Sequence, residues 1–201
     1  MDFFFQILVL IMSVVVHEVS HGYAARSLGD HTAEYEGRLT LNPLKHLDPF
    51  GSIILPLLSY YLGGFLIGWA KPVPYNPYNL RPGRWSEAWV AAAGPLSNFC
   101  LALIFGLIVR FGEAALNPAF ASLAVMIVVI NIVLMVFNLV PIPPLDGSKL
   151  LFALFPSRLS RFRDFFEKQG FILLLLFIFF LWQYLSPVVG LIFRLIVGGG
   201  L

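Results

Sequence analysis

Five long apolar runs dominate the sequence and limit the folds that it can adopt. They cover approximately residues 3–25, 51–70, 88–110, 119–141 and 170–197. A helix needs about 20 apolar residues to cross a bilayer, and each run is close to that length. Charged residues make up only 12% of the chain, about half the share of an ordinary soluble domain. We therefore expect an all-α, multi-pass membrane protein, a bundle of about four to six membrane segments in a single domain over residues 1–201.

Two of these runs contain residues that interrupt a straight helix. Pro56 and the pair Gly63-Gly64 divide the second run, and broken helices at membrane depth usually line a cavity. Ser186-Pro187 divides the last run, which leaves either one kinked span or a span followed by a short second helix. Between the first two runs, residues 33–41 alternate in a way that predicts a short β-hairpin turning near Gly37.

The most specific chemical signal is the pentapeptide His17-Glu18-Val19-Ser20-His21 at the end of the first run. On a helix, residues i and i+4 share a face, so the two imidazoles can bind one metal ion with Glu18 beside it. Ionisable side chains within a membrane segment are costly and usually functional. The pattern therefore predicts a site for one Zn²⁺ ion, with His17 and His21 as ligands.

A catalytic zinc ion needs a third protein ligand and one open position for water. Most acidic residues lie in polar loops, whereas Asp146 follows an apolar run and the prolines at 141, 143 and 144. These prolines prevent a regular helix, so the chain can turn there toward a site. Asp146 is our predicted third ligand. The alternative is a carboxylate that caps the helix beginning near Ser148.

The motifs resemble the site-2 protease family of intramembrane zinc metalloproteases. The resemblance rests on the HExxH of the first span combined with NxxPxPxLDG at residues 138–147. Three further segments match the short prokaryotic branch without PDZ or CBS domains, at residues 37–43, 71–77 and 94–98. The resemblance implies a metalloendopeptidase that cleaves transmembrane protein substrates within or near the cell membrane, with Glu18 as the catalytic base acting on a zinc-bound water.

Three polar residues are further candidates for contact with the substrate or the developing oxyanion. Asn138 matches a family asparagine with that role, and a carboxamide N–H is a suitable neutral donor; the alternative is a hydrogen bond between helices. Asn98 either lines the substrate path or ties helices together. His46 is either an additional ligand or donor, or a solvated loop histidine.

Basic residues and the shared zinc ion together predict the topology. Arg158, Arg161, Arg163 and Lys168 form the densest basic loop, which we place in the cytoplasm. His17 and Asp146 each lie near the C-terminal end of a span, so those spans are most simply parallel, and the run 88–110 supplies the one crossing needed between them. The run 51–70 should therefore enter and leave on the cytoplasmic side, which places the active site toward the cytoplasm. The alternative is a full crossing.

Other functions are weaker fits to the residues. A net charge of +2 gives no reason to expect a nucleic-acid partner. A prenyl-protein-processing HExxH peptidase would need a later Glu or His ligand on a helix. A non-proteolytic zinc protein, such as a transporter, should show polar residues along a path through the spans, and a scaffold would not need Glu18. The sequence leaves homo-oligomerisation and a regulatory membrane partner open.

Overall fold

The fold is helical wherever the structure describes it. The computed structural model describes residues 2–63, 71–112, 116–155 and 160–198, and this part contains no strand. Four of its helical stretches are long and apolar enough to cross a membrane, namely Phe3–Ser27, Ser86–Gly112, Pro118–Asn138 and Arg163–Tyr184. The predicted class, a multi-pass helical membrane protein, is confirmed, with a number of spans at the lower end of the expected range.

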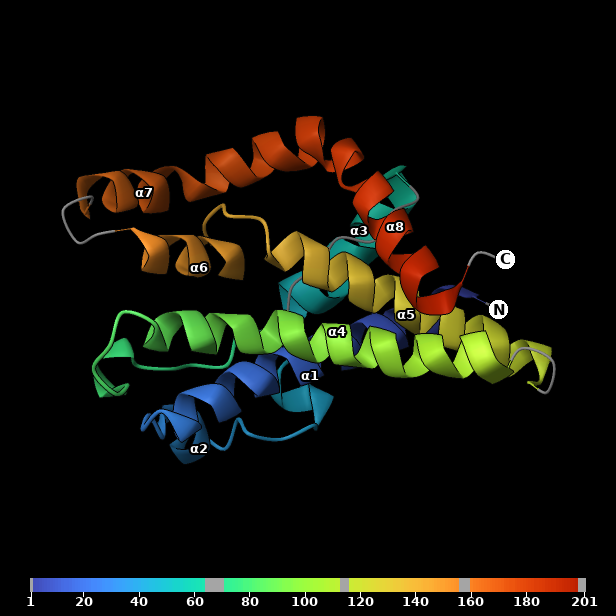
Figure 1. The fold of residues 1–201 in the computed structure, drawn as a ribbon, viewed down its shortest axis with the longest axis horizontal. Coiled ribbons are helices and arrows are strands. Elements are labelled where there is room, and N and C mark those ends of the chain that lie inside the picture. The colour runs from blue at the N-terminus through green and yellow to red at the C-terminus, as the bar shows by residue number, and fades with distance from the viewer. Residues whose placement is uncertain (1, 64–70, 113–115, 156–159, 199–201) are drawn as a thin grey trace.

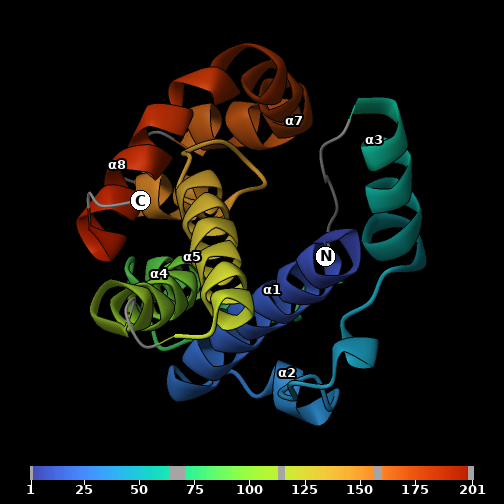
Figure 2. The same ribbon diagram turned by 90° about the vertical axis from the view of Figure 1, so that its right-hand side faces the viewer.

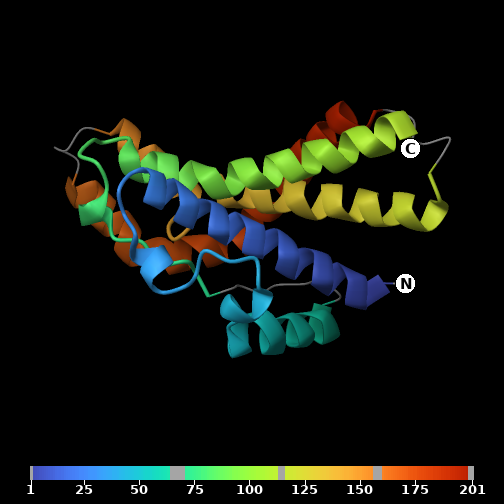
Figure 3. The same ribbon diagram turned by 90° about the horizontal axis from the view of Figure 1, so that it is seen from below.

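Three spanning helices form the centre of the bundle (Figure 3). α1 (Asp2–Ser27) and α5 (Pro118–Asn138) run in the same direction, and α4 (Ser86–Gly112) runs in the opposite direction against both. The small residue Ala102 of α4 is fully buried in the core with Val128 and Ile132 of α5. Close approach over small residues is the usual basis of helix packing in membranes. As a result, α1 and α5 bring their C-terminal ends to one end of the bundle.

The last apolar run forms a span followed by a short second helix (Figure 1). α7 (Ser160–Leu176) continues through a π-helical turn and a 3₁₀ turn to Tyr184. α8 (Ser186–Val197) then starts at the predicted break, with Pro187 in its first turn, where proline is well tolerated. α8 packs on α4, because Gly106 has no side chain to clash with Ile196. Part of the expected basic loop is helical, since α7 begins at Ser160.

The predicted β-hairpin at residues 33–41 is wrong. Thr32–Tyr35 instead form a short helix, α2. The carboxylate of Asp30 accepts hydrogen bonds from the backbone N–H and the hydroxyl of Thr32, at 3.2 and 2.6 Å, which is an Asx turn. Gly37 follows the helix with φ of 63°, the left-handed conformation that ends many helices. Polar contacts at both ends of this short segment therefore override its weak alternation.

The second apolar run contains no spanning helix in its described part. A π-helical turn (Pro49–Ile54) leads into α3 (Leu55–Gly63), and residues 64–70, with half of the Gly63-Gly64 pair, lie outside the described residues. α3 lies beside the N-terminal part of α1 (Figure 2), where the rings of Phe3 and Tyr60 are 4.2 Å apart. The N–H of Lys71 donates to the carbonyl of His46 at 2.8 Å. The chain thus returns to the point that it left, which favours the re-entrant path.

The re-entrant path predicts that Lys45 and Arg81 face the same side of the membrane. In a Cys100→Ser background, Lys45→Cys and Arg81→Cys should react with an impermeant thiol reagent from one side. Both residues are exposed, and the chain that leaves after Lys45 returns beside it through the hydrogen bond from Lys71 to His46. Ala119→Cys, at the opposite end of α5, should react from the other side. Labelling of positions 45 and 81 from opposite sides would instead mean that the second run crosses completely.

Candidate metal centre

Two histidines in the C-terminal half of α1 meet one aspartate that follows the end of α5. His17 and His21 lie one turn apart on α1, and Asp146 is the first residue of α6 (Asp146–Leu154). The two Nε2 atoms are 3.0 Å apart, and each lies 3.2 Å from Oδ2 of Asp146. The exposed fractions of His17, His21 and Asp146 are only 5%, 8% and 7%. The three ligand atoms therefore converge on one buried point.

The spacing of the three atoms fits a zinc ion. In a tetrahedral site with ligands at about 2.0–2.1 Å, neighbouring ligand atoms lie about 3.3 Å apart. The observed separations of 3.0–3.2 Å are close to that value. Two imidazoles and one carboxylate are also the ligand types of many catalytic zinc sites, which keep the fourth position for water. Within the described residues, no other group of three or more His, Cys, Asp and Glu side chains has this geometry.

Hydrogen bonds at Nδ1 fix the tautomer of both imidazole rings. Nδ1 of His17 lies 2.6 Å from Oδ1 of Asn98, and Nδ1 of His21 lies 2.7 Å from the carbonyl of Val90. Both partners are acceptors, so in the neutral rings the N–H is on Nδ1 and the lone pair is on Nε2. Two lone pairs and a carboxylate then face one another with no proton between them. This donor set is complementary to a cation and is typical of metal-binding histidines.

Asp146 reaches the histidines through the proline-rich turn that follows α5. Asp146 contacts both imidazoles and lies in the first turn of α6, preceded by Leu145 at the cap position. Gly147 allows this turn to pack against the end of α5, because a side chain there would clash with the backbone of Leu139 and Val140. The geometry favours the predicted ligand role of Asp146 over the capping alternative.

Gly94 allows α4 to approach the metal ligands. A Cβ atom at this position would lie 2.5 Å from Nε2 of His17 and in contact with Nε2 of His21. Such distances are well below van der Waals contact. The glycine of the 94–98 segment thus leaves room for the ligand atoms, and Pro95 beside it is also buried.

A buried polar chain links three helices behind His17. Asn98 of α4 accepts from His17 and donates from Nδ2 to Oδ1 of Asn131 on α5, at 2.8 Å. Asn131 in turn donates to the hydroxyl of Ser13 on α1 at 2.9 Å. Both asparagines are fully buried. These bonds favour the helix-tying interpretation of Asn98, which also holds the ring of His17, a candidate metal ligand.

Asn131 and Ser13 were not found from the sequence. Both are ordinary polar residues inside apolar runs, and Asn131 lies in the most apolar of the spans. That position was the available signal, because an amide in a membrane span usually pairs with another helix. The identity of its partners depends on how the helices pack.

Glu18 lies beside the metal ligands and is held by the backbone of a distant segment. Its Oε2 atom accepts a hydrogen bond of 2.8 Å from the N–H of Val73. Gly22 makes this approach possible, because a Cβ there would lie 2.9 Å from the side chain of Val73. The carboxylate of Glu18 is half-buried. A carboxylate fixed beside a metal site is suited to general-base chemistry.

The other two predicted residues lie outside this cluster. Asn138 is in the last turn of α5, and its Nδ2 donates to the carbonyl of Leu134 at 2.9 Å. His46 is fully buried, and its Nε2 lies 2.8 Å from the carbonyl of Thr40, so it is not a solvated loop residue. A contact of Asn138 or His46 with substrate stays a prediction.

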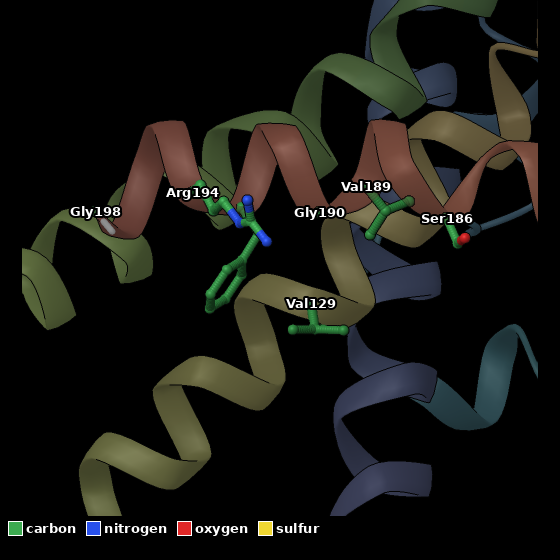
Figure 4. A pocket seen from close by; sticks show the side chains of 7 residues that line it. Val129, Ser186, Val189, Gly190, Arg194 and Gly198 are labelled. Carbon is green, nitrogen blue, oxygen red and sulfur yellow. The ribbon is translucent and has the colours of Figure 1, made fainter. Parts of the chain in front are cut away.

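A separate cavity of about 540 Å³ opens between α5 and α8. Figure 4 shows Val129 on one side and Ser186, Val189 and Arg194 on the other. None of its lining residues belongs to the metal cluster or contacts it. The cavity therefore has no part in the chemistry described above.

Comparison with known proteins places the chain in a family. The model of Peptidase family M50 matches it in two overlapping parts, residues 5–114 and 107–181. The chain belongs to peptidase family M50. This membership confirms the resemblance to the site-2 proteases and the prediction of a zinc metalloprotease. No solved structure matches the chain.

Several bacterial and archaeal relatives in the M50 family carry the name "Putative zinc metalloprotease". YwhC of Bacillus subtilis is 40% identical over 176 residues, which cover 84% of this chain and 77% of YwhC. MJ0611 of Methanocaldococcus jannaschii is 31% identical over 73% of this chain and 72% of its own length. Rip2 of Mycolicibacterium smegmatis is 38% identical over 68% of this chain, but the match spans only 52% of Rip2.

Adding a methyl group at Gly94 should abolish zinc binding. Gly94→Ala places a Cβ against both Nε2 atoms, while alanine favours the helix itself by about 1 kcal/mol. We expect the purified variant to remain folded in thermal unfolding but to contain little zinc by metal analysis. Gly190→Ala is the matched control, since its Cβ would meet nothing within 4 Å. Equal zinc content in the Gly94 variant and the wild type would contradict this account of the site.

Removing the amide of Asn98 should weaken zinc binding. Asn98→Leu leaves the N–H of His17 without its acceptor, and loss of such an outer partner typically lowers metal affinity about 10- to 100-fold. Competition with a chelator measures the change. Ser97→Ala is the control, because the Ser97 hydroxyl bonds only to the carbonyl of Gly94 on the same helix. An unchanged zinc Kd in Asn98→Leu would show that the network does not orient the ligand.

Proposed function

We propose that this protein is an intramembrane endopeptidase that hydrolyses peptide bonds of transmembrane protein substrates. The observation that carries the proposal is the buried cluster of His17, His21 and Asp146 beside Glu18, with both histidines inside a helix long enough to span a bilayer. Membership of peptidase family M50 supports the same chemistry.

Each residue of the cluster has a distinct part in this reaction. His17, His21 and Asp146 would hold the zinc ion. When bound, zinc supplies Lewis-acid activation of a water molecule and of the scissile carbonyl. Glu18 accepts the proton of the attacking water at its carboxylate and then gives it to the leaving amine. Val73 keeps the carboxylate in one orientation through Oε2, so the proton has a fixed acceptor.

The site also requires a locally extended substrate. In a transmembrane helix each carbonyl is hydrogen-bonded within the helix and hidden from attack. We infer that cleavage takes place near the end of a substrate span, where a helix opens most easily. Lys and Arg are in excess around the end of the bundle that holds the metal cluster, which favours a cytoplasmic position for this end. The protein would be a multi-pass protein of the cell membrane.

Substitution of Glu18 tests the reaction directly. Glu18→Gln should retain zinc, because the three ligands are unchanged, and should lose cleavage activity by at least about 100-fold, because the general base is removed. The assay uses purified protein in liposomes and a single-span substrate with a Gly-Pro pair near its cytoplasmic end. Glu36→Gln serves as the control, since Glu36 is exposed at the end of α2. Full activity in Glu18→Gln would rule out the metalloprotease mechanism, and zinc binding without any cleavage by the wild type would favour a transporter or scaffold.

A further inference from the structure

One extended segment crosses the active site and is fastened at both ends. We call residues 71–76, which follow the second apolar run, the strap. At its far end, the N–H of Asn76 donates to Oδ2 of Asp30 at 2.7 Å. Burial alone would raise the pKa of the Asp30 carboxyl, but hydrogen bonds from Thr32, Asn79 and Asn76 outweigh burial and hold that pKa below its usual value. The far anchor is therefore a charged carboxylate at neutral pH.

The near end of the strap is held by a buried arginine. Nη2 of Arg38 donates to the carbonyl of Lys71 at 2.9 Å and to the carbonyl of Pro72 at 3.2 Å. Arg38 is only 5% exposed. These two carbonyls immediately precede Val73, whose N–H is the hydrogen-bond donor to Glu18.

Arg38 and Glu18 bind the same peptide group from opposite sides. The carbonyl of Pro72 and the N–H of Val73 belong to one peptide unit, and in a trans peptide these two groups point in opposite directions. The guanidinium of Arg38 donates a hydrogen bond to the carbonyl oxygen, while the carboxylate of Glu18 accepts a hydrogen bond from the N–H. Hydrogen bonds arranged in such a chain polarise and strengthen one another. Arg38 is thus connected to the catalytic carboxylate through a single amide.

The two registers adjacent to the observed one cannot bind Glu18. Pro72 and Pro74 flank Val73 and have no backbone N–H. A shift of the strap by one residue in either direction would therefore place a proline against the carboxylate and lose the hydrogen bond. The position of the strap along its own axis has to be fixed, and the two carbonyls bound by Arg38 fix it.

The local sequence directs Arg38 toward the strap. Gly37 ends α2 in the left-handed conformation, with its N–H bonded to the carbonyl of Glu34 at 3.0 Å. The N–H of Arg38 bonds to the carbonyl of Ala33 at 2.9 Å. This pair of bonds is a Schellman motif, which reverses the chain at the end of a helix. The glycine and the arginine of the 37–43 segment therefore act together.

The charge of Arg38 is buried without a carboxylate partner among the residues that the structure describes. Its Nη2 bonds are to carbonyl groups, and its Nε has no partner there. A buried charge is costly unless it is paired. A neutral donor would suffice if the only task were to hold a loop. The free-energy cost of burying the guanidinium charge is consistent with a role of Arg38 that depends on charge, namely polarising the peptide group that binds Glu18.

We propose that Arg38 is a positioning residue for catalysis, which orients the carboxylate of Glu18 through the Pro72–Val73 peptide group. This inference rests on the proposed peptidase function. Among the described residues, the side-chain hydrogen bonds of Arg38 go to the strap and not to the metal ligands. Its loss should therefore slow the chemical step while zinc binding and substrate affinity are retained.

Arg38→Gln is the direct test. It keeps a hydrogen-bond donor but removes the charge and the simultaneous hydrogen bonds to the two carbonyls. We therefore expect kcat to fall about 10- to 100-fold, the range typical of lost outer contacts. KM and zinc content should be unchanged. Arg38→Lys restores the charge and should recover part of kcat. Arg26→Gln is the matched control, because Arg26 is exposed and its one ion pair within the described part of the chain is with Glu34, at 3.0 Å. Its kcat should equal that of the wild type.

Two further measurements separate this role from a general loss of structure. Deuterium uptake of residues 71–76 should rise in Arg38→Gln and not in Arg26→Gln, and this readout needs no substrate. Val73→Pro removes the N–H that binds Glu18 and should lower kcat by a similar factor. If both residues act through one peptide group, the double variant should be no slower than Val73→Pro alone.

The outcomes distinguish this proposal from the peptidase function itself. Equal cleavage by the wild type and Glu18→Gln would overturn the peptidase function, whereas wild-type kcat in Arg38→Gln beside an inactive Glu18→Gln would overturn only the role of Arg38. Loss of zinc from Arg38→Gln, or losses that multiply in the double variant, would also overturn it. If Arg38→Gln does not fold, the role of Arg38 would be overturned by a wild-type kcat in Arg38→Lys together with full activity in Val73→Pro.

Discussion

The convergence of three electron-pair donors on one buried point is the constraint on which the rest of the structure depends. The Nε2 atoms of His17 and His21 and a carboxylate oxygen of Asp146 lie within 3.2 Å of their neighbours. Without a cation, the two lone pairs and the carboxylate repel one another. A bound cation turns the same three atoms into ligands. The helices must therefore deliver residues 125 or more positions apart in the chain to the same depth. The parallel arrangement of α1 and α5 achieves this.

Glycine residues and buried amides allow the three donor atoms to converge. Gly94 makes room for the ligands, and Gly22 makes room for the strap. Asn98 and Asn131 satisfy each other across α4 and α5 and hold His17 in the tautomer that leaves Nε2 free. Buried amides are costly unless paired, so this chain of bonds is satisfied only when the three central helices have one relative position. The same contacts that fix the bundle also fix the metal ligand.

The segments between α1 and α4 supply the backbone that binds Glu18. The chain leaves near His46, forms α3 and returns at Lys71, and a backbone hydrogen bond closes this excursion. The strap that follows is gripped by Arg38 at its start and by Asp30 at its end, and Val73 meets Glu18 between them. Glu18 is thus bound by backbone from a loop, whereas His17 and His21 are bound by groups of α4. Different parts of the structure therefore fix the Glu18 carboxylate and the two imidazoles.

The sequence by itself determined the chemistry and the helical class. Helical periodicity puts His17 and His21 on one face next to Glu18, and run length sets the spans, because both depend only on local geometry. The sequence also indicated Asp146, the break at Ser186 and the need for parallel spans. It misplaced a hairpin at residues 33–41, where the Asx turn of Asp30 and the left-handed Gly37 decide for a helix. Only the tertiary structure decided what Asn98, Asn131, Val73 and Arg38 contact. These tertiary partners lie 33 to 118 residues away in the chain, and a hydrogen bond at such a separation depends on the packing of whole helices rather than on any local pattern.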